Sequence, residues 1–191
     1  TSAAVLGTSM KSVGEAMAIG RSFQESLQKA LRSLETGVSG LDEIELPVSE
    51  DALNKDILHG WLSEQTPDRI FRIAQAIRQG MSLSEIHAST KWDYWFLGQI
   101  SSIIQLEEKL KESGLPSSKA DLLSLKSAGF HDNRIAYLTN CQREEVNQLR
   151  KSQNIHPVFK RIDTCAAEFA SETAYFYSTY EEDENAECES N

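Results

Sequence analysis

Apolar residues recur at helical spacing over most of the chain after residue 49, and glycines separate the apolar stretches. Ile70, Ile73, Ala74 and Ile77 form one such stripe, which Gly80 closes. A spacing of three to four residues is typical of an amphipathic helix, and a glycine directly after the stripe is typical of a helix end. The pattern therefore predicts a mainly α-helical protein.

Seven helices are expected in this region. They are a weak helix over Ser49–Leu62 that Gly60 interrupts, a helix with Pro67 at its first position after Thr66, a short helix after the capping box of Ser82 and Glu85, the longest helix over Trp92–Glu112, and helices over Ser118–Ala128, His131–Leu138 and Gln142–Ser152. The longest helix ends at Gly114. Its apolar side is expected to contain Trp92, Trp95 or Phe96, Ile100, Ile103 or Ile104, Leu106 and Leu110.

Two stretches of the helical region resemble each other, and each begins with a glycine. Residues 80–90 and 129–139 share, in order, a glycine, an apolar residue, a polar residue that can cap a helix, an isoleucine and a final threonine. We interpret them as two copies of one helix–turn–helix unit. A chain built from such units is expected to pack against something rather than to carry out chemistry.

The two ends of the chain have other patterns. Thr8–Gly20 predicts an extended β segment that leads into a helix, with Ser22 at the N-cap and Glu25 at its third position. Gly37 ends that helix, and residues 37–47 form a linker. The segment from Val158 to Tyr180 is rich in aromatic residues without a clean period, which predicts an extended strap. A single strand needs a sheet that the rest of the chain does not supply.

Composition narrows the functional classes. The 191 residues, 40% apolar, suffice for one domain or one and a half. The net charge is −10, and six acidic residues near the C-terminus predict a solvated tail over 181–191. An acidic chain argues against sequence-independent binding of nucleic acid. No apolar run approaches the ~20 residues of a membrane span, and residues 1–6 do not form a signal peptide. Three widely spaced cysteines predict a reducing compartment.

The sequence contains only weak evidence for catalytic or metal-binding residues. The four histidines are not spaced as metal ligands, and His131 is interpreted as a helix cap. Cys165 could be a nucleophile beside Lys160 and Arg161, but no histidine is adjacent in sequence, so a structural role is favoured. No catalytic, cofactor-binding or metal-binding residue is therefore predicted.

One surface is a candidate for binding a partner. The short helix after Ser49 has more apolar residues than can face one core, so we assign Leu53, Ile57 and Trp61 to an oligomer interface. The alternative is that these side chains pack under neighbouring loops. A second functional hypothesis is a helix–turn–helix nucleic-acid-binding module, in which residues 142–152 would provide Arg143, Arg150 and Lys151.

Several motifs together resemble the large chain of carbamoyl phosphate synthetase, over essentially the whole chain and in order. The motifs are residues 10–21 (MKSVGEAMAIGR), 25–32 (ESLQKALR), 68–70 (DRI), 95–97 (WFL), 106–108 (LEE), 156–169 (HPVFKRIDTCAAEF) and 175–181 (YFYSTYE).

The resemblance implies a domain plan. Residues 1–36 would end the first ATP-grasp half, residues 37–157 would form the helical oligomerization domain, residues 158–180 would lead to the second half, and residues 181–191 would be the acidic tail. The fold class implied is mainly α, with repeated helix-turn-helix units and a preceding strand and helix from an ATP-grasp domain.

The resemblance also implies a functional setting. The parent enzyme is an allosteric ligase that makes carbamoyl phosphate from bicarbonate, ammonia derived from glutamine and two ATP, with Mg²⁺ or Mn²⁺, in pyrimidine or arginine biosynthesis. The family's catalytic residues lie outside this chain, which is expected to be inactive alone and to need no cofactor. Its expected partners are a second copy, the flanking ATP-grasp halves and the small glutamine amidotransferase chain, but neither nucleic acid nor membrane. The expected location is cytoplasmic or organellar.

Overall fold

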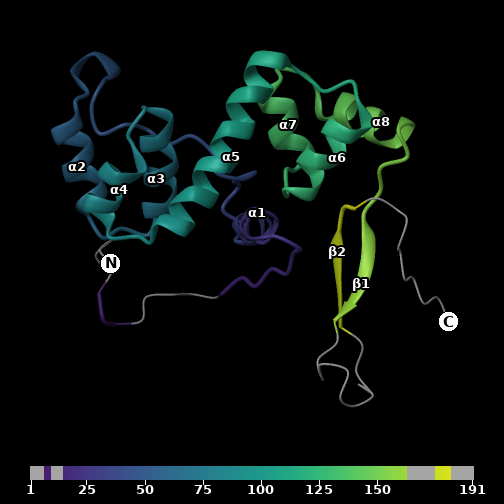
Figure 1. Cartoon of the computed structure of the whole chain (residues 1–191), viewed down its shortest axis with the longest axis horizontal. Helices are drawn as coiled ribbons and strands as arrows, with labels where there is room; N and C mark the ends of the chain where they lie inside the picture. The colour runs from purple at the N-terminus through teal and green to yellow at the C-terminus, as the bar shows by residue number, and fades with distance from the viewer. Residues whose placement is uncertain (1–6, 10–14, 163–174, 182–191) are drawn as a thin grey trace. The chain divides into compact units, whose positions relative to one another are not determined.

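The computed structural model describes residues 7–9, 15–162 and 175–181. Its elements, in chain order, are α1 (Phe23–Ser33), the short 3-10 helix η1 (Glu50–Ala52), α2 (Lys55–Ser63), α3 (Arg69–Arg78), α4 (Leu83–Thr90), α5 (Tyr94–Ser113), α6 (Lys119–Ser127), α7 (Asp132–Leu138), α8 (Arg143–Ser152), β1 (Val158–Ile162) and β2 (Tyr175–Thr179). The predicted mainly α class is thus confirmed, and one two-stranded sheet is added to it (Figure 1).

The chain divides into two compact units. The first comprises Thr1–Ala16 and Leu31–Glu108, and the second comprises Met17–Ala30 and Lys109–Asn191. Within the first unit, α2 packs against α3 and α4. Its core is made by buried aliphatic side chains, among them Leu41, Leu58, Leu62, Ile73, Ile86, Leu97, Ile100 and Ile103.

The predicted repeat is confirmed down to its backbone hydrogen bonds. Gly80 and Gly129 have positive φ angles of 80° and 92°. The next residues, Met81 and Phe130, are buried, and each donates a 3.1 Å hydrogen bond to the carbonyl oxygen five residues earlier. This is the Schellman helix end, in which the left-handed residue favours glycine because glycine has no Cβ. The same local chemistry therefore ends both α3 and α6.

A polar N-cap begins the next helix in each copy. Ser82 Oγ accepts from the Glu85 backbone N–H at 3.3 Å, and Glu85 Oε2 accepts from the Ser82 N–H at 2.8 Å, which confirms the capping box. Hydrogen bonds from Lys55 and Ser82 lower the pKa of Glu85 to about 2. In the second copy, His131 Nδ1 accepts from the Asn133 N–H at 3.2 Å, so the predicted cap role of His131 is also confirmed.

The predicted course of α2 was wrong in two places. The helix begins after Asn54, whose Oδ1 accepts from the Ile57 N–H at 3.0 Å, whereas Ser49 precedes η1. Gly60 lies within α2 and does not interrupt it. A glycine inside a helix costs only about 1 kcal/mol, and the buried Leu58 anchors this stretch to the core.

The start of α3 also differs from the prediction. The helix begins at Arg69 with Asp68 as its N-cap, so Pro67 lies in the preceding turn and not at the first helical position. A proline suits either place because its ring fixes φ near the value that both a turn and a first helical turn require.

The buried side of α5 differs from the predicted one. Leu97, Ile100, Ile103 and Ile104 are buried, whereas Trp95 and Phe96 are exposed. Leu97 and Phe96 both lie at helical spacing from the isoleucines, so the sequence pattern alone did not distinguish them. The structure assigns the core position to Leu97.

A buried ion pair lies in the first unit. Glu107 continues the buried side of α5, and its Oε2 lies 2.6 Å from Arg78 Nη2, with the two side chains 0% and 6% exposed. Arg78 also donates to the Leu41 carbonyl oxygen and, at 3.3 Å, to Gln75 Oε1. These contacts join α3, α5 and the segment before η1.

The second unit has a buried charge cluster of its own. Asp132, the first residue of α7, accepts from Lys126 Nζ at 2.6 Å and from Arg150 Nε at 3.3 Å. Lys126 also donates to the Phe130 carbonyl oxygen at 2.8 Å, and Arg150 donates to the Ile155 carbonyl oxygen at 3.0 Å. The single carboxylate therefore ties α6, α7 and α8 together.

This cluster predicts a loss of stability in acid. Burial raises the pKa of Asp132, but the positive charges of Lys126 and Arg150 lower it more, so its net shift is downward from 3.8. The stabilisation is complete above the unfolded-state pKa and is lost as the pH falls through the lower folded-state pKa. We expect Asp132→Asn to reduce the free energy of unfolding by about 2–3 kcal/mol near neutral pH.

Urea unfolding over a series of pH values checks this expectation. The difference between the wild type and Asp132→Asn should shrink as the pH falls below 3.8. A difference that stays constant into acid would show that the charge of Asp132 is not the cause.

The described parts of the strap predicted after Pro157, residues 158–162 and 175–179, are extended, as expected, but they are also paired. β1 and β2 form an antiparallel hairpin in which Phe159 lies opposite Ser178 and Arg161 lies opposite Phe176. Along β1, half-buried residues alternate with exposed ones, as in a strand with one covered face. Cys165, considered above as a nucleophile, lies outside the described residues.

The predicted N-terminal strand is wrong where it can be compared. Residues 15–20 have no regular structure, and residues 10–14 lie outside the described part. The physical reason is the one anticipated above, because a strand persists only with a partner strand beside it. The start of the helix that follows is confirmed: Ser22 Oγ accepts from the Glu25 N–H at 3.1 Å, and α1 begins at Phe23. Its predicted end at Gly37 is wrong, because α1 ends at Ser33. The predicted linker, residues 37–47, contains neither helix nor strand.

Candidate functional site

The predicted oligomer interface lies on α2 and the residue before its N-cap. Ile57 and Trp61 are four residues apart and lie along one side of α2, whereas Leu53 lies in extended backbone just before the helix. All three are half-buried, whereas Leu58 and Leu62 face the core. The structure thus places Ile57 and Trp61 on one side of α2 with Leu53 just before the helix, and leaves none of the three fully exposed.

Trp61 is further held by an arginine from α3. The Arg72 guanidinium lies 5.2 Å from the centroid of the Trp61 ring, and Arg72 Nη1 donates to the Trp61 carbonyl oxygen at 2.9 Å. Arg72 also pairs with Glu64 at 2.7 Å and with Asp68 at 3.1 Å. These contacts fix one end of the α2 surface, which consists of Leu53, Ile57 and Trp61.

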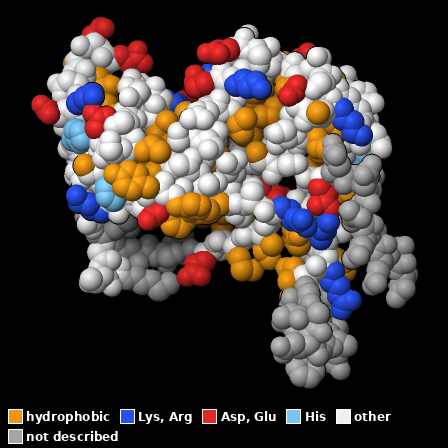
Figure 2. Space-filling model, viewed as in Figure 1, with side chains coloured by type: hydrophobic (Ala, Val, Ile, Leu, Met, Phe, Trp, Pro, Cys, Tyr) orange, Lys and Arg blue, Asp and Glu red, His pale blue; other side chains and the backbone are white. Residues whose placement is uncertain are grey.

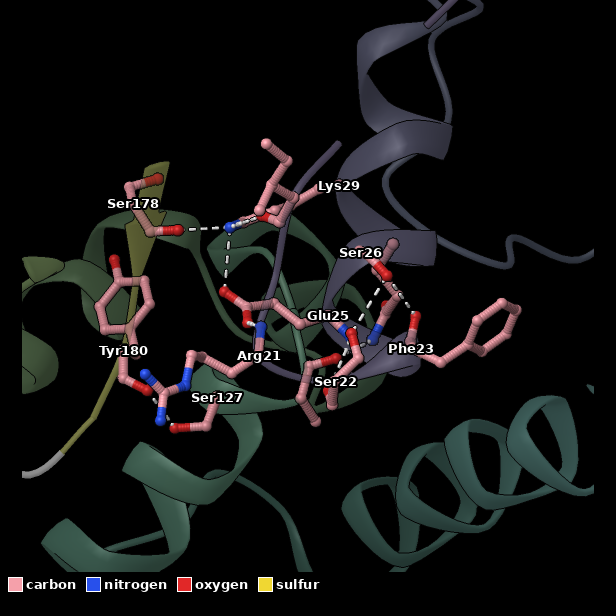
Figure 3. A network of polar contacts seen from close by, with 12 residues as sticks. Arg21, Ser22, Phe23, Glu25, Ser26, Lys29, Ser127, Ser178 and Tyr180 are labelled. Atoms are coloured by element: carbon pink, nitrogen blue, oxygen red, sulfur yellow. Dashed lines mark hydrogen bonds and ion pairs between the residues drawn. The ribbon is translucent and has the colours of Figure 1, made fainter. Parts of the chain in front are cut away.

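A second site lies in the other unit and joins residues far apart in the chain. Lys29 Nζ donates to the Ser178 carbonyl oxygen on β2 and, at 2.8 Å, to the Ile19 carbonyl oxygen. The same ammonium lies 3.0 Å from Glu25 Oε1 (Figure 3). Glu25 Oε2 in turn accepts from the Arg21 N–H at 2.6 Å. A single lysine therefore bridges the segment before α1, α1 itself and β2.

Further contacts strengthen this bridge. The Ser127 hydroxyl donates to the Tyr180 carbonyl oxygen at 2.6 Å, and Lys126 Nζ lies 5.0 Å from the centroid of the Tyr180 ring. Figure 3 shows Ser127 beside Tyr180 in the same network. We call the group of Arg21, Glu25, Lys29, Ser127, Ser178 and Tyr180 the clasp.

The first residue of the predicted acidic tail belongs to the edge of the clasp. Glu181 pairs with Lys160 and lies 3.8 Å from Arg21 Nη1. A hydrogen bond with Tyr177 raises the pKa of Arg21. Glu181 is thus part of the folded structure, which corrects the solvated-tail prediction for this residue; residues 182–191 lie outside the described part.

Gly129 allows α1 to lie against the end of α6. A Cβ atom at Gly129 would lie 2.8 Å from Glu25 Cα and 3.2 Å from Gln28 Cβ. Gln28 is fully buried and donates through Nε2 to the Ala128 carbonyl oxygen at 2.9 Å. The glycine of the second repeat copy therefore serves as a helix end and as a docking point for α1.

The charged and polar groups of the clasp hold segments together, and their partners are backbone carbonyls and carboxylates of the same unit. Among the residues that the structure describes, no group of three or more His, Cys, Asp or Glu side chains is placed to hold a metal ion. Within the same residues, no helix combines the length and the apolar character that crossing a membrane requires.

One of the three basic side chains that the nucleic-acid hypothesis places on α8 is engaged in contacts within the fold. Arg150 points to Asp132 and to the Ile155 carbonyl oxygen, so its guanidinium is engaged within the unit. Arg143 and Lys151 remain on a helix that also carries Glu144 and Glu145. A helix with this charge balance does not offer the basic surface that phosphate contacts need.

An exposed aromatic group at the start of α5 was missed as a site. Tyr94, Trp95 and Phe96 are 51%, 54% and 42% exposed. A signal was present in the sequence, because successive residues of a helix point about 100° apart and Tyr94 to Leu97 cannot all face one core. Trp95 or Phe96 was instead expected on the buried, apolar side of the helix.

Taken together, these features define a helical domain whose conspicuous sites are contact surfaces. The description "Carbamoyl-phosphate synthetase large chain, oligomerisation domain" belongs to the family model that matches residues 15–154. The chain belongs to this family.

Curated relatives extend the match beyond that domain. The carbamoyl phosphate synthase large chain of Brucella melitensis is 54% identical over 180 residues, which is 94% of this chain and 16% of the relative. Those of Mesorhizobium japonicum and Vibrio cholerae are 54% and 50% identical over 184 and 187 residues, covering 93% and 97% of this chain and 16% and 17% of the relatives. The chain spans about one sixth of the length of the curated relatives it matches.

Proposed function

We propose that this chain is the self-associating spacer of a carbamoyl phosphate synthetase large chain, forming a dimer or a higher oligomer through the α2 surface. The observation that carries the proposal is the α2 surface itself, in a domain whose family is described by oligomerisation. Leu53, Ile57 and Trp61 are half-buried apolar side chains beside exposed polar residues, and interfaces commonly have an apolar centre within a polar rim.

The spacer part of the proposal rests on the clasp. Lys29 and Glu25 connect the segment at Ile19 to β2, so the two ends of the helical region are fixed to one another within one unit. A spacer with its ends held in this way can set a constant geometry for what precedes and follows it in a longer protein. The finer domain division at residues 36, 157 and 180 stays a prediction.

The chemistry belongs to the wider proposal. In a full large chain, two ATP-grasp halves would make carbamoyl phosphate from bicarbonate, ammonia and two ATP, using Mg²⁺ or Mn²⁺, with ammonia supplied by a small glutamine amidotransferase chain. The catalytic groups would lie in those halves, in the cytoplasm or an organelle, in pyrimidine or arginine synthesis.

Substitution of Leu53 tests self-association. We expect the 191-residue chain to sediment as a dimer or larger species at high concentration, and Leu53→Glu to weaken that association at least about 10-fold. The reason is that a carboxylate forced into an apolar contact must be desolvated without a partner, and about 1.4 kcal/mol already corresponds to a tenfold change. Sedimentation equilibrium over a range of concentrations measures the constant.

Gln148→Glu is the matched control, because it adds the same charge at an exposed position of α8. It should leave the association constant unchanged. If the wild type stays monomeric at all concentrations, self-association of this chain is wrong. If the wild type associates and Leu53→Glu associates equally well, the α2 surface is wrong.

A further inference from the structure

Three acidic side chains border the apolar residues of the α2 surface. Glu50 and Asp51 lie in η1 just before Leu53, and Asp56 lies in the first turn of α2, directly before Ile57. The three acidic residues are exposed, whereas Leu53 and Ile57 are half-buried. Figure 2 shows acidic side chains at the upper left, over the segment that leads into α2. We call Glu50, Asp51 and Asp56 the acidic rim.

The basic side chains of the neighbouring elements are engaged with other carboxylates. Lys55 Nζ lies 2.5 Å from Glu85 Oε1, and Arg72 pairs with two carboxylates that do not belong to the acidic rim. Within the described residues, no basic side chain forms an ion pair with the acidic rim. The wider sequence has the same imbalance, because residues 31–108 contain 13 acidic and six basic residues. The α2 surface is therefore bordered by uncompensated negative charge.

Symmetry brings like charges together when two copies associate through this surface. The commonest homo-oligomer is a two-fold dimer, in which the same patch of both copies meets. In a contact of this kind the acidic rim of one copy lies close to the acidic rim of the other. Like charges repel each other, and dissolved salt screens the repulsion between exposed groups. The apolar residues of the α2 surface then favour association while the acidic rim opposes it.

We infer that the acidic rim opposes self-association by charge repulsion, so that a second copy binds the α2 surface more tightly as the ionic strength rises. The inference rests on the proposed function, because the acidic rim can oppose only an association that the α2 surface makes. It adds a means of control that the apolar residues do not provide. Leu53 and Ile57 are uncharged, so their contact contains no charge for salt to screen.

The opposite salt dependence would follow if Lys55 reached across to the acidic rim of the partner copy. Ion pairs between the copies would then stabilise the dimer, and salt would weaken it. The structure favours repulsion for two reasons. Lys55 is already paired with Glu85, and the acidic rim contains three carboxylates for this one ammonium. The direction of the salt effect therefore distinguishes the two arrangements.

Sedimentation equilibrium of the 191-residue chain at two salt concentrations tests the inference. The distance over which exposed charges interact falls from about 20 Å in about 20 mM NaCl to about 4 Å in about 500 mM NaCl. We expect the association constant of the wild type to rise at least about fivefold between these conditions, because several weak repulsions between exposed groups are screened together. The pH is kept neutral throughout, so that the carboxylates stay ionised.

A pair of isosteric substitutions locates the effect. Asp51→Asn with Asp56→Asn removes two charges from the acidic rim, so it should raise the association constant at low salt and reduce its dependence on NaCl. Glu112→Gln with Glu144→Gln is the matched control, because it removes the same charge at exposed positions of the second unit. The control should keep the salt dependence of the wild type.

Leu53→Ser separates the apolar contribution from the charge. It shortens the apolar side chain without adding a charge, so it should weaken association by a similar factor at both salt concentrations. Association equal to that of the wild type at both concentrations would place the salt-dependent contact elsewhere on the chain, which overturns the inference.

The remaining outcomes separate this inference from the proposed function. A wild type that associates with a constant that is unchanged by NaCl, or falls with it, overturns the inference and leaves self-association in place. The same holds if Asp51→Asn with Asp56→Asn retains the full salt dependence. A wild type that stays monomeric at both salt concentrations overturns the proposed self-association and this inference together.

Discussion

Replacing Gly129 by alanine is expected to destabilise the second unit severely and to release α1 from it. The φ angle of 92° at this position is one that alanine adopts only with strain of roughly 1–2 kcal/mol. The added Cβ would also lie 2.8 Å from Glu25 Cα and 3.1 Å from the Glu25 carbonyl oxygen, both backbone atoms of a helix. Forcing such a contact apart typically costs a further 1–3 kcal/mol or so.

The repeat provides a matched control for this prediction. Gly80 occupies the same place in the first copy, with a φ of 80° and the same Schellman hydrogen bonds, but a Cβ there would meet no heavy atom within 4 Å. Gly80→Ala should therefore show the backbone strain alone, roughly 1–2 kcal/mol. The difference between the two variants isolates the docking of α1.

Urea unfolding measures the free energy of unfolding of the two variants, and hydrogen exchange shows which segments are destabilised. In Gly129→Ala the backbone amides of Glu25 to Lys29 and of β2 should exchange faster, because the clasp depends on the position of α1. Gly80→Ala should leave those amides unchanged. Equal losses of stability in the two variants, with β2 unaffected, would show that the close approach at Gly129 carries no energy.

The local features of the fold were predictable from the sequence because their causes are local. The ends of α3 and α6 follow from Gly80 and Gly129, and the start of α4 follows from Ser82 and Glu85. Each depends on residues within one helical turn, so a short stretch of sequence contains all the relevant chemistry. The repeat was visible for the same reason, since it repeats these local signals.

Features that depend on distant residues were not predictable in the same way. The pairing of β1 with β2 is set by a register between segments more than ten residues apart, and nothing within the strap itself indicates it. The clasp joins Lys29 to Ser178, a separation of 149 residues. Side-chain pattern cannot reveal such pairs, because either partner alone resembles an ordinary surface residue.

The candidate functional surfaces include one that the sequence could predict and one that it could not. The α2 surface could be proposed from an excess of apolar residues on a short helix, and the structure leaves that surface half-buried. Trp95 or Phe96 was expected on the apolar side of α5 because Phe96 and Leu97 fit the helical period equally well, but both aromatic side chains are exposed. Only the packing of Leu97 against the rest of the first unit decides which side of α5 remains exposed.

Replacing Glu107 by leucine is the second change with a large expected effect. Glu107 is fully buried and its Oε2 lies 2.6 Å from Arg78 Nη2, so the substitution leaves a guanidinium buried without this carboxylate. Removing one partner of a buried ion pair typically destabilises a protein by about 3–5 kcal/mol, because the remaining charge is uncompensated. That is a large share of the roughly 5–15 kcal/mol by which domains are stable.

Adding Arg78→Met to Glu107→Leu separates the stability effect of losing the ion pair from that of the changed side-chain shape. With both charges gone, we expect the double variant to be more stable than Glu107→Leu alone, since the buried Arg78 charge is removed together with its carboxylate. The recovery should be incomplete, because Arg78 also donates to the Leu41 carbonyl oxygen and to Gln75. Urea unfolding of the single and double variants gives the coupling energy directly.

A surface pair of similar length serves as the control for burial. Lys55 Nζ lies 2.5 Å from Glu85 Oε1, but the lysine side chain is 70% exposed. Lys55→Met should change the free energy of unfolding little, because water already screens that attraction. If Glu107→Leu is no more damaging than Lys55→Met, or if the double variant is as unstable as the sum of its single changes, the buried pair does not hold α3 and α5 together.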